Sequence, residues 1–314
     1  MCLTEHIPRP DTDLYPDEHD HAHYTQPGGL ERLFDDYYTE AKRLQHKYQD
    51  KIHILVGFET EWIRTEQSES IVKGLLEKYR CDVFVGSVHH VHTFPIDYDD
   101  ETFAQARRTA GERRQTGAAT LTDAEAEEAL FADYFDTQYE MLKALHPPVV
   151  GHFDLIRLKA KHPDKDWRSM KDVWDKIVRN LKFVAEYGGL LELNTSALRK
   201  GLEQPYPRVE ICQVCRSDRL ERERKVLMIL QEFLKLSGRF TLSDDSHSID
   251  QIGTNYERLF DEFLDKASIK ELCYLERSSD TGGAKTNATH VRTASIAQLR
   301  QHAFMQIASQ KSRS

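Results

Sequence analysis

Short apolar runs alternate with longer segments of helical periodicity along most of this chain. Runs of apolar and partly β-branched residues predict strands at 2–4, 52–58, 82–88, 147–151, 190–193, 240–242 and 272–275. Between them, apolar residues recur at three- and four-residue spacing and predict helices within 30–44, 71–79, 122–145, 169–184, 217–236 and 257–266. Thr122 and Glu125 have the spacing of a capping box at the start of one of these helices. Short apolar strands separated by helices predict an α/β fold with a parallel sheet.

Polar side chains follow most of the predicted strands directly. They include His6, Glu59, His89, His152, Asn194 and Asp245. A β/α barrel collects its active-site residues from successive strand ends in this way, whereas a doubly wound sheet concentrates them at one switch point. No glycine-rich phosphate loop follows any strand, which argues against a nucleotide-binding sheet. The pattern favours a TIM-like barrel.

Three stretches lack this alternation. The charged, weakly periodic segment 97–120 predicts a surface insertion in a domain that spans 1–276. The segment 277–314 is rich in Ser, Thr and Ala, and predicts a C-terminal extension with one short helix near 296–307. The segment 11–24 is polar and rich in histidine, and we expect a solvated loop there.

Composition narrows the classes of function. The 314 residues are 39% hydrophobic and 30% charged, as in a globular domain with a full core. The net charge of −9 argues against binding nucleic acid or an anionic membrane surface, and favours a small-molecule substrate. No apolar run has the length of a membrane span, and the five scattered cysteines suit a reducing compartment, so we expect a cytoplasmic protein.

The chemistry that the strand ends predict is metal binding. Imidazole nitrogens and carboxylate oxygens are ligands that divalent ions accept. Two neighbouring ions would stabilise the attacking and leaving oxygens of a phosphoryl transfer, and Glu59 could bridge them with its two oxygens. Glu61 and His90 are second choices. The candidate ligands are His6, Glu59, His89, His152, Asp245 and His247.

The motifs around these residues, taken in order, resemble the PHP (polymerase and histidinol phosphatase) family. They are LTEHIPR, GFETEW, GSVHHV, VVGHFDLIR, LELNTSALRK and LSDDSHSIDQIG, and the resemblance runs from Met1 to about Leu275. It is greatest to the fungal and bacterial members that act in histidine biosynthesis. The resemblance implies a distorted seven-stranded TIM-like (β/α) barrel with up to three divalent ions, of zinc, manganese or iron. It also implies hydrolysis of L-histidinol phosphate to L-histidinol and phosphate, with the same six ligands and a catalytic role for Asp245.

The resemblance supplies candidate substrate contacts as well. Arg157 and Arg199 fall where similar enzymes place cations that face the phosphate, and we expect both to be catalytic and substrate-binding. An arginine fork matches phosphate oxygens in a bidentate way, although either arginine could instead pair with a surface carboxylate. Asn194 and Ser196, at a strand end, are candidates for hydrogen bonds to the substrate.

One departure from the family pattern bears on activity. The family opens with a His-x-His strand, whereas this sequence starts at what resembles the second strand, so we expect the first strand and its helix to be absent. His21 and His23 have the spacing of that motif but lie in a polar loop after His6. Fewer than three ions and weak hydrolysis would follow.

Two other functions and one other motif remain open at this point. The chain could be a PHP phosphoesterase with another substrate, such as a nucleotide, or a catalytically weak remnant that keeps a metal site. Cys212 and Cys215 form a Cys-x-x-Cys motif, but no second pair accompanies it, which favours incidental cysteines over a zinc or redox site.

Overall fold

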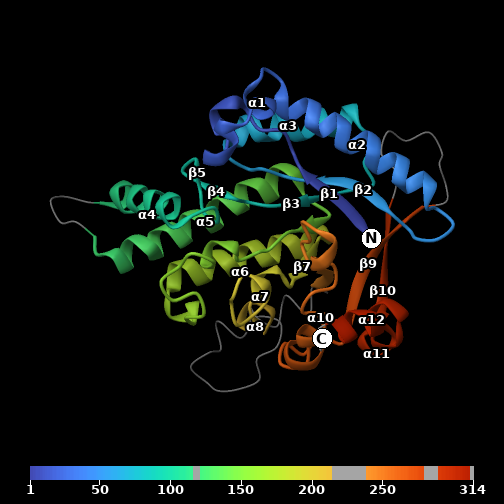
Figure 1. Ribbon diagram of the computed structural model, residues 1–314. Helices are drawn as coiled ribbons and strands as arrows, with labels where there is room; N and C mark the ends of the chain where they lie inside the picture. The colour runs from blue at the N-terminus through green and yellow to red at the C-terminus, as the bar shows by residue number, and fades with distance from the viewer. Residues whose placement is uncertain (116–120, 214–237, 279–288, 312–314) are drawn as a thin grey trace.

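A mostly parallel, eight-stranded sheet organises the protein (Figure 1). The computed structural model describes residues 1–115, 121–213, 238–278 and 289–311. The strand order is β1-β2-β3-β6-β7-β8-β9-β10, and a separate hairpin pairs β4 with β5. The strands are β1 (Cys2–His6), β2 (Leu55–Glu59), β3 (Val83–Gly86), β4 (His90–Val91), β5 (Phe94–Pro95), β6 (Val149–Val150), β7 (Leu190–Asn194), β8 (Arg239–Ser243), β9 (Glu271–Arg277) and β10 (Thr289–Ser295).

The order of the sheet is that of a β/α barrel. Within the eight-stranded sheet, the strands β1 to β9 follow one another in chain order and pair in parallel, and β10 is antiparallel to β9. The chain passes through the separate antiparallel hairpin of β4 and β5 between β3 and β6. Among the described residues β1 pairs with β2 alone, so the sheet is open on the outer edge of β1. The pair formed by β8 and β9 is limited to Thr241 and Cys273. These features fit a distorted TIM-like barrel and confirm the predicted α/β class.

Helices fill most of the connections between strands. In Figure 1, α2 and α3 lie on the side of β1 and β2, while α5 and α6 lie side by side in the left half of the view. The described α-helices are α1 (Ala22–Thr25), α2 (Gly29–Lys47), α3 (Thr65–Lys78), α4 (Asp100–Arg114), α5 (Asp123–Leu145), α6 (Lys171–Tyr187), α7 (Ser196–Arg199), α8 (Val209–Gln213), α10 (Tyr256–Arg258), α11 (Ile296–Gln301) and α12 (Ala303–Lys311). Shorter turns are η1 (Asp11–Asp13), η2 (Pro16–Asp20), η3 (Leu155–Arg157), η4 (Trp167–Ser169), η5 (Ile249–Gln251) and the π-helical η6 (Leu259–Phe263).

The predicted helix starts and strand cores follow from local chemistry. The capping box at α5 is confirmed, since Thr122 N–H donates to Glu125 Oε2 at 2.7 Å and Glu125 N–H donates to Thr122 Oγ1 at 3.3 Å. All residues of β2 and β7 are buried, as expected for strands covered on both faces. The interior carries an apolar layer that includes Leu55, Val83 and Leu190, and the strand ends lie beyond it.

Three segments differ in part from their expected local structure, and one expected helix lies outside the described residues. The segment 97–120 contains α4, which packs against α5 through Phe103, Ala106 and Ala110, so it is more regular than its weakly periodic sequence indicated. That this segment is an insertion in the domain stays a prediction. The C-terminal segment contains β10 and two helices, where a loop and one helix were expected. Most residues of the segment 11–24 are exposed, as expected for a solvated stretch, although Asp13 is buried and an ion-pair network described below ties the segment to the rest of the protein. The helix expected within 217–236 falls outside the described residues.

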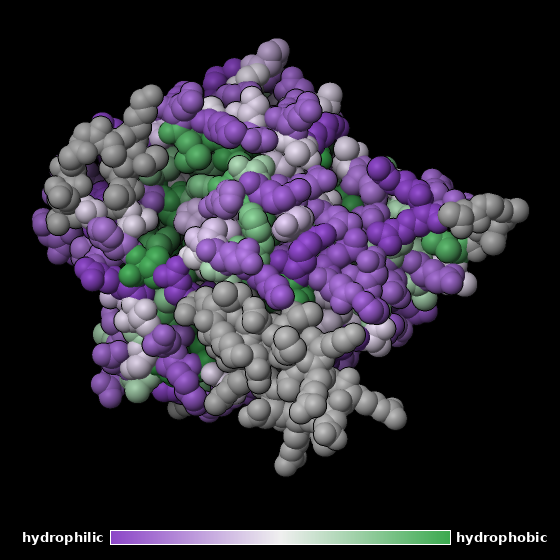
Figure 2. Space-filling view, turned by 180° about the vertical axis from the view of Figure 1, so that it is seen from behind, coloured by the Kyte–Doolittle hydropathy of each residue, from purple (hydrophilic) through white to green (hydrophobic). Residues whose placement is uncertain are grey.

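The surface is largely polar. Figure 2 shows one face of the protein, on which hydrophilic residues cover most of the described surface and hydrophobic residues form smaller areas among them. No helix among the described residues is long and apolar enough to cross a membrane.

Candidate metal centre

The strand ends bring three buried side chains to one point. Glu59 is the last residue of β2, and it lies level with His6 of β1 on one side and Val85 of β3 on the other. His89 and His152 lie in the loops that begin at the ends of β3 and β6. The sequence permits this close arrangement through Gly57, where a Cβ atom would lie 1.9 Å from the carbonyl oxygen of Val83.

The ligand atoms of this group have the spacing that a divalent ion requires. His152 Nε2 lies 2.9 Å from Glu59 Oε1 and 3.1 Å from His89 Nε2. His89 Nε2 lies 3.5 Å from Glu59 Oε1. Ligand atoms about 2.0–2.1 Å from a tetrahedral zinc ion would be about 3.4 Å apart. The three atoms therefore fit around one divalent ion with little movement.

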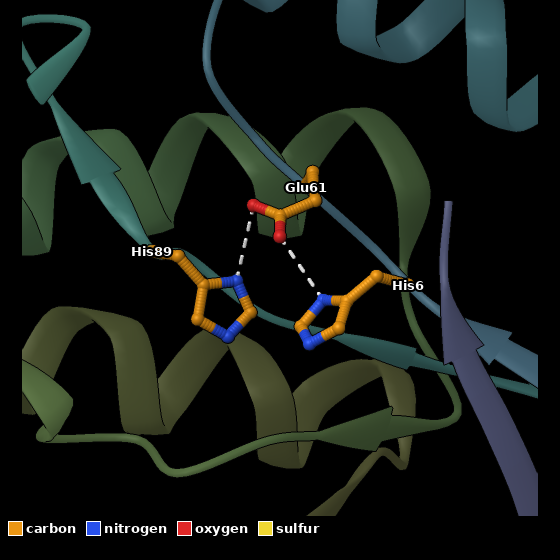
Figure 3. A group of neighbouring side chains, drawn as sticks. All are labelled: His6, Glu61 and His89. Atoms are coloured by element: carbon orange, nitrogen blue, oxygen red, sulfur yellow. Dashed lines mark hydrogen bonds and ion pairs between the residues drawn. The ribbon is translucent and has the colours of Figure 1, made fainter. Parts of the chain in front are cut away.

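Glu61 forms a second group with His6 and His89 (Figure 3). Its Oε1 lies 3.0 Å from His6 Nδ1, and its Oε2 lies 3.2 Å from His89 Nδ1 and 3.5 Å from His90 Nδ1. The rings of His6 and His89 meet edge to face, with centroids 5.0 Å apart. His89 is thus common to both groups and offers a different nitrogen to each.

The buried carboxylates of Glu59 and Glu61 favour positive charge on the neighbouring imidazoles. Burial disfavours a charged imidazole, but the hydrogen bond to Glu61 and its charge outweigh burial and raise the pKa of His6 to about 10. In the same way Glu59 raises the pKa of His152 to about 9. Burial alone would raise the pKa of Glu59, yet the hydrogen bond with His152 and the nearby imidazoles hold that pKa well below its usual range. A site that holds protons this firmly also attracts a divalent cation.

The two candidates that follow β8 are less enclosed. Asp245 has a left-handed backbone with φ 49°, and its carboxylate is largely buried. His247 is exposed, with Nδ1 3.0 Å from the Asp245 carbonyl oxygen. The Arg199 guanidinium donates to the carbonyl oxygens of Asp244 and Asp245 at 2.9 and 2.8 Å, so it holds the turn that presents Asp245.

Comparison with known proteins now decides the family. The sequence profile of the PHP domain matches residues 1–196. The chain belongs to the PHP domain family. It is 42% identical over 285 residues to a Schizosaccharomyces pombe protein named "Probable histidinol-phosphatase", covering 90% of this chain and 81% of that protein. It is 30% identical over 305 residues to the histidinol-phosphatase of Saccharomyces cerevisiae, covering 88% of this chain and 82% of that protein. The crystal structure of hisK from Listeria monocytogenes has the same fold, with a TM-score of 0.58, 18% identity, and coverage of 82% and 87% of the two chains.

Arg157 of this PHP domain is fully engaged inside the protein. Its side chain is fully buried and donates to Asp154 at 3.1 Å and to Asp164 at 3.3 Å. It also donates to the carbonyl oxygens of Gln204 and Pro205 at 2.7 and 2.9 Å. Through these contacts Arg157 joins the segment of Asp154 and Asp164 to the segment of Gln204 and Pro205. A contact between Arg157 and phosphate stays a prediction.

The β7 end contributes one engaged and one available group. Asn194 Oδ1 accepts the Ser196 N–H at 2.8 Å, and Asn194 Nδ2 donates to Glu192 Oε2 at 3.0 Å. The Ser196 hydroxyl is buried and has no hydrogen-bond partner among the described residues. Asn194 therefore shapes the strand end, and the contact of Ser196 with substrate stays a prediction.

Three residues at the centre were not identified from the sequence. Glu192 accepts the His152 N–H at 2.7 Å, and its charge within the apolar run of β7 was a signal that could have identified it. Arg9 and Tyr15 contact Glu61, both at 3.4 Å. They come from a polar segment whose sequence carries no sign of this contact.

The alternative motifs remain apart from the two groups. His21 and His23 are exposed, and their rings contact each other and Tyr24. Cys212 is buried, whereas Cys215 lies outside the described residues.

Proposed function

We propose that this PHP domain is a metal-dependent histidinol-phosphatase, which hydrolyses L-histidinol phosphate to L-histidinol and phosphate. The observation that supports this most directly is the cluster of Glu59, His89 and His152, buried at the mouth of the sheet. It occurs in a chain that is 42% identical, over 90% of its length, to a relative named for this activity. The net charge of −9 supports a small phosphate ester over a nucleic acid as substrate.

The donor set indicates which residues would hold the ions. Glu59, His89 and His152 would hold the first divalent ion, because their ligand atoms already converge. His6, Asp245 and His247 would contribute to further sites. Zinc, manganese and iron all suit such mixed nitrogen and oxygen ligands, and a bound ion would supply Lewis acidity toward the phosphate oxygens.

Arg199 and Ser196 would bind and orient the phosphate group of the substrate. Arg199 fixes the turn of Asp245 through two backbone carbonyl oxygens, and we expect its guanidinium to face the phosphate of the substrate. The Ser196 hydroxyl can donate to a phosphate oxygen. In the reaction a water oxygen forms a bond to phosphorus, the ester P–O bond breaks, and the histidinol oxygen takes up a proton. We expect the enzyme to act in the cytoplasm, which the free cysteines Cys2, Cys81 and Cys273 support.

The test is a steady-state assay of phosphate release with zinc or manganese supplied. We expect kcat/KM for histidinol phosphate to exceed that for a simple ester such as para-nitrophenyl phosphate, and Glu59→Ala to abolish turnover of both. Arg43→Ala is the matched control, because Arg43 is exposed and pairs with Glu40 on the surface of α2. Equal kcat/KM for the two esters would contradict the substrate, and unchanged turnover in Glu59→Ala would contradict the site.

A further inference from the structure

The two metal-binding groups share His89, and its two nitrogens have different surroundings. Nε2 faces His152 and Glu59, whereas Nδ1 faces Glu61 Oε2 at 3.2 Å. A metal-binding imidazole normally uses one nitrogen for the ion and donates the N–H of the other to a carboxylate or carbonyl. The arrangement around His89 matches this division, with Nε2 directed to the ion site and Nδ1–H to Glu61.

His6 repeats the arrangement on the other oxygen of the same carboxylate. Its Nδ1 lies 3.0 Å from Glu61 Oε1, and Figure 3 shows that both imidazoles turn their Nδ1 atoms toward Glu61 and their Nε2 atoms away from it. The Glu61 side chain is only 1% exposed. One buried carboxylate is therefore placed to fix the tautomer and direction of two ligand imidazoles.

A network behind Glu61 holds this carboxylate in place. Arg9 Nη1 and Tyr15 OH each donate to Glu61 Oε1 at 3.4 Å. Arg9 in turn donates through Nη2 to both oxygens of Glu18, at 2.5 and 2.6 Å, and through Nε to the Asp13 carbonyl oxygen at 3.1 Å. Its guanidinium also lies over the Tyr15 ring, 4.4 Å from the centroid. The Arg9 guanidinium therefore joins the loop after β1 to Glu61. Glu18, the Asp13 carbonyl oxygen and the Tyr15 ring keep this guanidinium in place.

We propose that Glu61 is a positioning residue for the metal centre: it accepts Nδ1–H from His6 and His89 and so directs their Nε2 atoms to the ions, while Arg9 and Tyr15 hold it. The alternative is that Glu61 is itself a ligand, as its proximity to two imidazoles would also allow. The two roles differ in a measurable way. Loss of a positioning carboxylate weakens binding and keeps the number of sites, whereas loss of a ligand removes a site.

The experiment is a zinc titration of chelator-treated protein with a competing chelator, on the wild type, Glu61→Gln and Arg9→Met. We expect Glu61→Gln to bind the wild-type number of zinc ions at saturation with about 10–100-fold weaker affinity. Arg9→Met should weaken binding in the same direction by a smaller factor, because Glu61 stays but loses its support. Raising free zinc by the same factor should restore turnover, which it would not do for a lost catalytic group.

Arg64→Met is the matched control for the loop. Arg64, at the start of α3, pairs with Asp13 of that loop, and its side chain is 42% exposed, so its loss should leave zinc affinity unchanged. Wild-type affinity in Glu61→Gln, or one zinc ion fewer at saturation, would overturn the proposal. If Glu61→Gln does not fold, Arg9→Met decides, since Arg9 contacts neither imidazole, and wild-type affinity in that variant would also overturn it. The inference rests on the metal binding of the proposed function. A wild type that binds zinc without hydrolysing histidinol phosphate would refute the substrate and leave this role intact.

Discussion

The two sides of the barrel mouth differ in how firmly they hold their candidate ligands. On the side of β2, β3 and β6, the side chains of Glu59, His89 and His152 are 11%, 5% and 5% exposed. On the side of β1 and β8, the side chains of His6, Asp245 and His247 are 32%, 18% and 64% exposed. On the first side the ligand atoms converge on one point, and on the second side the candidate ligands are more exposed to solvent.

The difference follows from strand pairing. The strands β2, β3 and β6 each have a parallel neighbour on both edges, which fixes the position of the residue at each strand end. Among the described residues β1 has one neighbour, and β8 pairs with β9 at a single position. Two-sided pairing thus provides the preorganisation that a metal site needs. Each prediction below either breaks or sharpens this contrast.

The largest effect is expected from removing a ligand on the well-paired side. His152→Ala should lose the first ion, since Nε2 of His152 contacts both other ligand atoms of the group. Changes that only disturb the orientation of ligands cost about 10–100-fold, so we expect turnover to fall by more than about 100-fold. Metal analysis of the purified variant, together with the phosphate-release assay, is the measurement. Full metal content in His152→Ala would show that the converging atoms are not the first site.

The contrast between well-paired and edge strands can also be tested by protein stability, with one leucine substitution in β7 and one in β1. Leu191 on β7 is buried and its strand is paired on both edges, whereas Leu3 on β1 is partly exposed on an edge strand. We expect Leu191→Ala to lower the free energy of unfolding by about 2–5 kcal/mol, and Leu3→Ala to lower it by less. Urea denaturation of both variants measures this. Equal losses would mean that the edge of β1 is as well packed as the centre of the sheet.

The sequence predicted the well-paired side better than the rest, for a physical reason. Parallel strands buried on both faces must be apolar, and the first polar residue after each one must lie at the strand end, so Glu59, His89 and His152 could be identified from local pattern alone. The order of the sheet followed from the alternation of strands and helices. The identity of the family needed the ordered motifs, since each histidine by itself is an ambiguous signal.

What the sequence did not predict depends on contacts between distant segments. The α4 helix was missed because it packs through small residues such as Ala106 and Ala110, which give a weak amphipathic pattern. The β10 strand was missed because its residues are mostly exposed and lack an apolar face. Arg9 reaches Glu61 across 52 residues of sequence, and no local pattern encodes such a pair.

Arg199→Lys tests how the less paired side is held. The arginine makes two hydrogen bonds to the turn of Asp244 and Asp245, and a lysine keeps the charge but cannot make both in the same geometry. One charge-assisted hydrogen bond contributes about 1.5–3 kcal/mol, so we expect kcat/KM to fall about 10-fold or somewhat more. The first zinc ion should bind as in the wild type. Unchanged kinetics would place Arg199 outside both the turn and the phosphate site.

The smallest effect is expected from His247→Ala. His247 is the most exposed of the six candidate ligands, and its Nδ1 contact is with the backbone of Asp245, two residues away. Because its side chain is exposed, the imidazole must be ordered when an ion binds, and that ordering opposes binding. We therefore expect His247→Ala to bind its first zinc ion within about 3-fold of the wild-type affinity. Only the affinity for the more weakly bound zinc ions should fall. Stepwise zinc titration separates the two classes of ion. Loss of the tightest ion in this variant would show that the exposed side, and not the buried one, forms the primary site.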